Sequence, residues 1–168
     1  MNFQFYFEKL VASEHFRNFM DEFPDAIACS CFFSIDVSGN KNDDRQHFDY
    51  FVPSTNKMYS FKLEQGCELI PAEMMGDYEP KRIGSNYNFD FEDVKKMILE
   101  KMKEEGIKNE LQKILFSLQN VEGKDYLMGT IFLSGLGMLK VNILIEEMKI
   151  TDFEKKSFMD MMNVFGKK

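Results

Sequence analysis

The chain lacks tryptophan and has few of the residues that build metal sites or disulfide frameworks. Its 168 residues include three Cys and two His. Three Cys, an odd number, do not form a disulfide framework. Cys29 and Cys31 are spaced as C-x-C, but a structural zinc site needs a second pair of ligands, and the sequence offers none. We therefore expect free thiols, no metal and no cofactor.

Long apolar runs and an excess of positive charge are also missing. No run approaches the ~20 apolar residues that span a membrane. The N-terminus, MNFQFYFEKL, lacks the basic leader and apolar core of a signal peptide. The net charge of -7 opposes general nucleic-acid binding, which depends on concentrated Lys and Arg. The sequence predicts a cytoplasmic protein that binds neither membrane nor nucleic acid.

Recognisable catalytic motifs are absent as well. His47 follows Asp44 by three residues, but nothing near it resembles a strained nucleophile turn. Gly135 and Gly137 lie between two expected strands and are not followed by a helix, so they do not form a phosphate loop. We predict no catalytic residues.

The chain is rich in Phe and Met, with 18 and 13 residues respectively, which predicts a Phe-rich core with Met as filler. Apolar residues at mixed spacings of three and four predict a helix over 5–22, ending near Phe23 because Pro24 disfavours helical geometry before it. From Ile27 to Val37 apolar residues alternate with polar ones, which is typical of a strand with one buried face.

The same reasoning predicts the other elements. Strands are expected over 47–52, 58–63, 111–118, 126–133 and 138–145, with one short strand over 68–70 and a helix over 90–105. Thr151 and Glu154 have the spacing of a helix capping box, which predicts a C-terminal helix over 151–165. That helix would carry Phe158, Met161, Met162 and Phe165 on one face.

The two halves of the sequence resemble each other. The segments 5–10, 31–36 and 53–58 match 89–94, 114–119 and 133–138, at separations of 84, 83 and 80 residues. Their conserved order predicts an α+β fold of two tandem α-β-β-β units, each a helix with a three-stranded antiparallel meander. The units cover 1–65 and 89–146, joined by a connector over 66–88, within one domain over 1–168. The alternative is an unrepeated α+β fold with the same element order.

Two motifs in the first unit carry a family resemblance. Phe19, Pro24, Asp25 and Ala26 end a helix, and Phe48, Asp49, Tyr50 and Pro53, continued by Lys57, Met58 and Phe61, follow in the strands. With a helix and three-stranded meander occurring twice, this resembles the PepSY-like domains, which share a cystatin-like architecture. The resemblance implies a non-enzymatic module, a type that in some settings is proposed to restrain peptidases and is often extracytoplasmic. The second unit ends in IEEMKITDFEKK and lacks the Asp-x-x-x-Gly turn that such domains often carry.

Two functions follow as expectations. The first is a non-enzymatic interaction protein, whose partner is another protein or a second copy of the chain, with an exposed sheet face or the C-terminal residues Phe158, Met161, Met162 and Phe165 as the contact. The alternative is a small-molecule-binding protein or minor enzyme with a pocket between helix and sheet, where His47, Asp49 and Tyr50 would be tested first. Transfer of the peptidase-inhibitor role rests on fold analogy alone.

Overall fold

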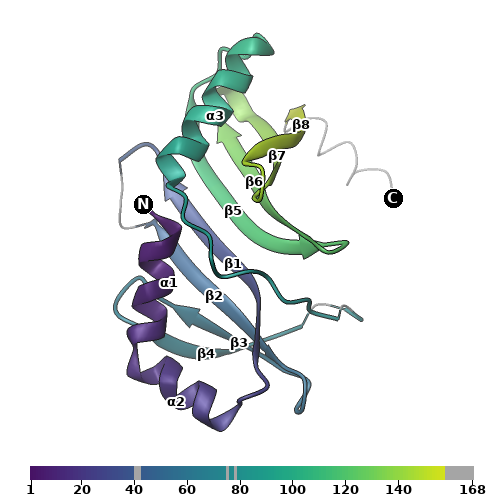
Figure 1. Ribbon diagram of the computed structural model, residues 1–168. Helices are drawn as coiled ribbons and strands as arrows, with labels where there is room; N and C mark the ends of the chain where they lie inside the picture. Colours follow the sequence, from purple (N-terminus) through teal and green to yellow (C-terminus); the bar gives the residue numbers. More distant parts are fainter. Residues whose placement is uncertain (40–42, 75, 78, 158–168) are drawn as a thin grey trace, which may run out of the picture.

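The protein is an α+β fold in which three helices cover one face of an eight-stranded antiparallel sheet (Figure 1). The computed structural model describes residues 1–39, 43–74, 76–77 and 79–157. None of the helices in these ranges is both long and apolar enough to cross a membrane. The elements are α1 (Phe3–Ala12), α2 (Glu14–Glu22), β1 (Ile27–Asp36), β2 (Arg45–Val52), β3 (Lys57–Lys62), β4 (Glu68–Ala72), α3 (Phe91–Glu104), β5 (Leu111–Val121), β6 (Lys124–Leu133), the 3-10 turn η2 (Ser134–Leu136), β7 (Gly137–Leu144) and β8 (Lys149–Ser157).

The strand order, β4-β3-β2-β1-β5-β6-β7-β8, divides the sheet into two halves of four strands. Within each half, strands that follow one another in the chain pair as antiparallel neighbours. The pairing of β1 with β5 joins the halves, so both share a single sheet. Each half has one strand more than the three we expected, because β4 lies in the expected connector and β8 extends the second half.

The seam between the halves is closed at the sheet and at the helix starts. In the β1–β5 pair, Phe33 lies directly opposite Phe116. Above it, the backbone N–H of Phe3 donates to the carbonyl of Phe89 at 3.0 Å, and the N–H of Phe91 donates to the carbonyl of Met1 at 2.8 Å. The first residue of α1 and the first residue of α3 are therefore each hydrogen-bonded to the segment that leads into the other helix.

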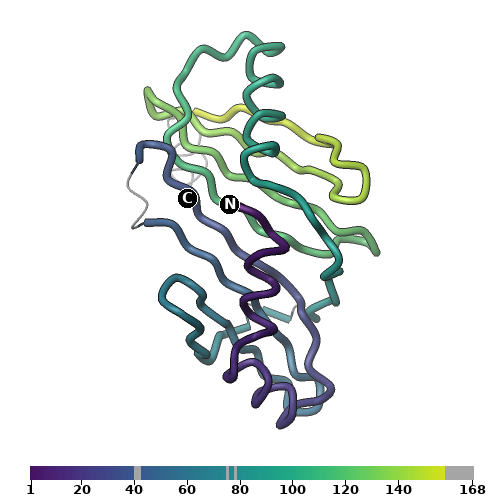
Figure 2. The backbone as a smooth tube through the Cα atoms, turned by 60° about the vertical axis from the view of Figure 1, so that its left-hand side comes forward, coloured from purple at the N-terminus to yellow at the C-terminus, as the bar shows by residue number. Residues whose placement is uncertain are grey.

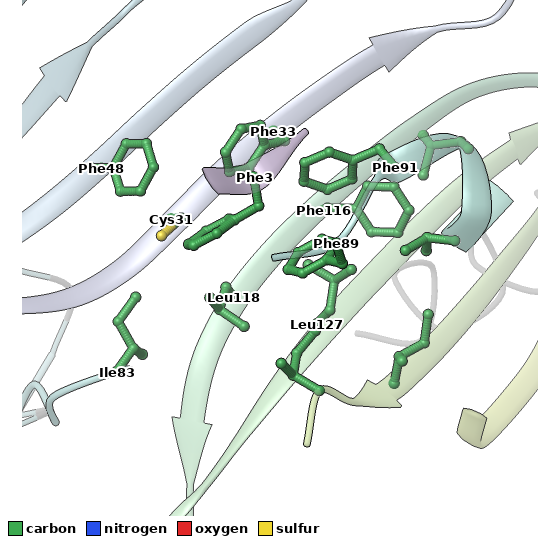
Figure 3. Close-up of a cluster of buried hydrophobic side chains, with 14 of the residues drawn as sticks. Phe3, Cys31, Phe33, Phe48, Ile83, Phe89, Phe91, Phe116, Leu118 and Leu127 are labelled. Carbon is green, nitrogen blue, oxygen red and sulfur yellow. The ribbon is translucent and has the colours of Figure 1, made fainter. Parts of the chain in front are cut away.

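An aromatic core lies between the helices and this seam (Figure 3). Phe33, Phe91 and Phe116 are almost fully buried. The ring centroids of Phe33 and Phe91 are 4.6 Å apart, and those of Phe91 and Phe116 are 5.4 Å apart. Because burying one such side chain contributes about 2–3 kcal/mol, this cluster is a main reason why the two halves form one unit.

The connector also binds both halves, as its path from the β4 side to α3 shows (Figure 2). Ile83 is buried, and its N–H donates to the carbonyl of Ala28 at 2.9 Å. The Asp125 carboxylate, in the turn side of β6, accepts hydrogen bonds from the Gly84 N–H at 2.7 Å, the Tyr87 hydroxyl at 2.6 Å and the Asn120 side-chain amide at 2.8 Å. Asp125 thus holds the connector against the second half.

The helix expected over 5–22 is wrong in its continuity, because it breaks at Ser13. Ser13 has extended backbone angles, its N–H donates to the Leu10 carbonyl, and its hydroxyl accepts from the Phe16 N–H at 3.1 Å. It thereby ends α1 and caps α2. The change of direction lets α1 bury Leu10 and α2 bury Phe19 over different strands.

The C-terminal helix expected over 151–165 is also wrong for its first residues, because 149–157 form strand β8. Ile150 and Phe153 are three residues apart, a spacing typical of one helix face. Here an irregularity in the pairing of β7 and β8, beside Ile143, places Ile150 opposite Ile143 and Phe153 opposite Val141, so both pack toward the core from a strand. Phe158, Met161, Met162 and Phe165 lie outside the described residues.

Candidate functional site

The three strand residues singled out from the sequence do not share one site. In β2 the buried, helix-facing residues Phe48 and Tyr50 alternate with His47 and Asp49. Successive side chains of a strand point to opposite faces. His47 and Asp49 therefore lie on the face of the sheet that no helix covers in the described part of the chain, while Tyr50 lies under α2.

Tyr50 belongs to the core. Its ring contacts Phe16 and Phe61 at centroid distances of 5.3 and 5.6 Å, and Phe19 lies 6.1 Å away. Burial raises the pKa of the Tyr50 hydroxyl far above its usual range. Aromatic rings fill the space between α2 and the sheet here, where the alternative function would need a pocket.

The family-like motif residues near Tyr50 have structural contacts. Phe19 is buried and packs edge-on against Phe61 at a centroid distance of 5.1 Å. The Asp25 carboxylate accepts a 2.8 Å hydrogen bond from the Ser54 N–H, which joins the start of β1 to the β2–β3 turn and lowers the pKa of Asp25. These contacts stabilise the first half and leave no motif side chain assigned to chemistry.

Asp49 takes part in a polar row across the helix-free face. Its carboxylate accepts a 2.7 Å hydrogen bond from the Ser30 hydroxyl. Ser60 lies opposite Asp49 on β3, and Gln119 lies opposite Ser30 on β5. The row is a hydrogen-bonding strip at the centre of the sheet, without a nucleophile activated by a base.

His47 lies at the edge of an open groove of about 530 Å³ at one end of the sheet. Its Nε2 atom is 2.5 Å from Oε1 of Glu64, and its ring contacts Phe32 at a centroid distance of 5.9 Å. Tyr6, Asp44 and Lys62 also line the groove. The pKa of Tyr6 is raised by burial and by the nearby Asp44 charge. Its lining is mainly polar, with both signs of charge.

The cysteines are poor nucleophiles in this fold. Cys29 and Cys31 are buried, and an irregularity between Ala28 and Ser30 interrupts the alternation of β1. Burial, with a smaller contribution from the Asp49 charge, raises the pKa of Cys29 to about 12 and also raises that of Cys31. Within the described ranges, no group of three or more His, Cys, Asp or Glu could hold a metal ion.

Sequence reasoning missed the apolar side chains of the helix-free face. Phe32, Leu115, Met128 and Phe132 lie on the parity opposite to the buried Phe33, Ile114, Leu127 and Ile131. They are partly to substantially exposed; Phe132, for example, is 38% exposed. A signal was present, because expected strands with one solvated face normally carry polar residues on that face, and here large apolar residues interrupt them.

Comparison with known proteins adds a fold relationship. No protein family model matches the chain. No curated protein matches it either. The chain is similar to a crystal structure of a candidate lipoprotein from Clostridium difficile 630, with a TM-score of 0.58 over 85% of this chain and 91% of the other at 12% identity. At that identity the similarity concerns the fold alone.

Proposed function

We propose that the chain is a non-enzymatic, PepSY-like binding protein, built from two copies of one helix-and-strand unit, and that a protein partner contacts the helix-free face of its sheet. The observation that carries this proposal is the set of apolar side chains, Phe32, Leu115, Met128 and Phe132, on a face that no described helix covers. Apolar patches of this kind mark interaction sites more often than they occur on inert surfaces.

The pairing at the seam supports the repeat. Two equivalent units related by a two-fold axis must bring equivalent residues face to face in the central strand pair. The sequence match at a separation of 83 residues makes Phe33 equivalent to Phe116, and these two residues are opposite each other. The reciprocal hydrogen bonds of Phe3 and Phe91 fit the same axis. They equate these two residues at a separation of 88, four more than the sequence match of the helices.

The contacts of the titratable groups support a role without catalysis. Among the described residues, His47 approaches Glu64 and Asp49 accepts from Ser30, and neither is beside an activated hydroxyl or thiol. The two buried cysteines are protonated at neutral pH because their pKa values are raised. General acid–base chemistry needs a positioned pair of groups facing a substrate, and this arrangement offers hydrogen bonds within the sheet instead.

Site-specific crosslinking tests the proposal. A photoreactive phenylalanine derivative would replace Leu115 on the helix-free face, and in a control it would replace Leu99, which is 42% exposed on α3. On illumination of cells that produce the protein, we expect a discrete protein adduct from position 115 and none of the same size from position 99. If neither position yields an adduct, or both yield the same one, the helix-free face is not the contact surface.

The groove beside His47 supports a second candidate, binding of a small polar molecule. Its charged lining, with Asp44 and Glu64 on one side of the balance and Arg45 and Lys62 on the other, suits a ligand that carries both charges. Amino acids would serve as probes. A thermal shift that the His47→Ala variant abolishes would favour this candidate, and the absence of any shift in the unaltered protein would remove it.

A further inference from the structure

The half of the helix-free face formed by β5–β8 differs in charge from the rest of the molecule. The whole chain has a net charge of -7. On this half, pairing and alternation place five lysines beside only two carboxylates: Lys113, Lys124, Lys140, Lys149 and Lys156 against Asp152 and Glu154. One of the carboxylates, Glu154, lies 3.8 Å from Lys156. A locally basic surface therefore exists on an acidic protein.

The same half is hollowed between its apolar side chains. A depression of about 320 Å³ is lined by Val121, Glu122, Lys124, Tyr126, Met128 and Asn142. Val121 is 38% exposed, so part of its apolar surface remains accessible. In the adjacent rows, Leu115 and Phe132 add apolar surface, and Lys113 lies opposite Phe132 in the strand pairing. Apolar surface is thus enclosed by lysine side chains from three strands.

From this juxtaposition we propose that the β5–β8 half of the helix-free face binds an acidic protein segment. One apolar side chain of the segment enters the depression beside Tyr126 and Met128, and its carboxylates pair with Lys124, Lys140 and Lys113. The proposal rests on the proposed function and names the chemistry of its partner.

Physical magnitudes favour this partner despite the acidity of the chain. Charges are screened over about 10 Å at 0.1 M salt, so the lysines at the surface dominate the potential near a bound segment. A small apolar anchor contributes through burial, while exposed ion pairs contribute less than about 1 kcal/mol each. The apolar anchor is therefore expected to supply affinity, and the lysines are expected to select for acidic segments.

The experiment uses the full chain and a fluorescein-labelled peptide of Glu and Asp residues around a central Phe. Fluorescence anisotropy measures binding at low and high salt. Control peptides replace the Phe by Ser or the acidic residues by Lys. We expect binding of the first peptide, weaker binding at high salt, weaker binding of the Ser peptide and none of the Lys peptide.

Charge reversal locates the surface. Lys124→Glu with Lys140→Glu turns two attractive contacts into repulsive ones and is expected to weaken peptide binding by about tenfold or more. The matched control, Lys96→Glu with Lys103→Glu, makes the same change of net charge on exposed positions of α3, over the other face of the sheet. We expect this control to change binding by less than about twofold, because the charges are distant and screened.

Three results would overturn the inference: no binding of the acidic Phe peptide, equal weakening by both double variants, or binding to vesicles of anionic phospholipid without binding to the peptide. The last would assign the face to a membrane surface instead. These failures are distinguishable from failure of the proposed function, because the crosslink from Leu115 reports any protein on the face, whatever its charge.

Discussion

Removal of the Asp125 carboxylate should loosen the connector while leaving the sheet intact. The carboxylate accepts three hydrogen bonds, from Gly84, Tyr87 and Asn120, at distances between 2.6 and 2.8 Å. A hydrogen bond to a charged group contributes about 1.5–3 kcal/mol. Since this site is only partly buried, water replaces some of the loss. We therefore expect Asp125→Ala to lower the free energy of unfolding by about 2 kcal/mol in total.

The measurement combines urea denaturation with amide hydrogen exchange followed by NMR. The Gly84 amide should exchange faster in Asp125→Ala, since it loses its acceptor, whereas amides within the β1–β5 pair should change only in proportion to global stability. Asp21→Ala, at an exposed position of α2, is the matched control and should change stability by less than about 0.5 kcal/mol. Unchanged exchange at Gly84, with a stability loss no larger than that of the control, would refute this account of Asp125.

Two further outcomes follow from the core. Phe33→Ala and Phe116→Ala should each cost about 3–5 kcal/mol of unfolding free energy in denaturant titrations, because both rings are fully buried opposite each other at the seam; a large loss for one and a negligible loss for the other would contradict the equal burial. In the native protein at pH 8, iodoacetamide should alkylate Cys67 and leave Cys29 and Cys31 unmodified, since raised pKa values keep both buried thiols protonated and the reaction requires thiolate. Mass spectrometry would count the labels, unfolding in urea should make all three cysteines reactive, and rapid native labelling of Cys29 would contradict its burial.

Hydrophobic periodicity predicted most of the fold, because most strands and α3 bury one face in a regular way. The strand expected over 126–133 is β6 (Lys124–Leu133), and the helix expected over 90–105 is α3 (Phe91–Glu104). The failures occur where a local irregularity changes the period. The irregular β7–β8 pairing lets Ile150 and Phe153, with helical spacing, pack from a strand, and Ser13 ends one helix and caps the next within a continuous apolar pattern. The serine before Glu14 was a visible capping signal for that break.

The candidate site was less predictable than the fold. Alternation along β2 separates Tyr50 from His47 and Asp49, and this could have been deduced from the sequence once Tyr50 was assigned to the core. The basic, apolar surface on β5–β8 could not, because it depends on the register that brings Lys113 opposite Phe132 and on the identity of 149–157 as a strand. Register depends on contacts between distant segments, which single-sequence periodicity does not contain.

The single pairing between the halves has a consequence for folding. Each of the other strand pairs joins neighbours in the chain through a short turn, whereas β1 and β5 are separated by more than 70 residues, including β2, β3, β4 and α3. Loop-closure entropy opposes that contact more than any hairpin contact. The hairpins of each half can therefore form early, and the rate-limiting step is expected to be the docking of β1 on β5, when Phe33 and Phe116 become buried together. Until that step, two sheet edges remain unpaired, and they are the edges through which a partly folded chain could associate with another copy.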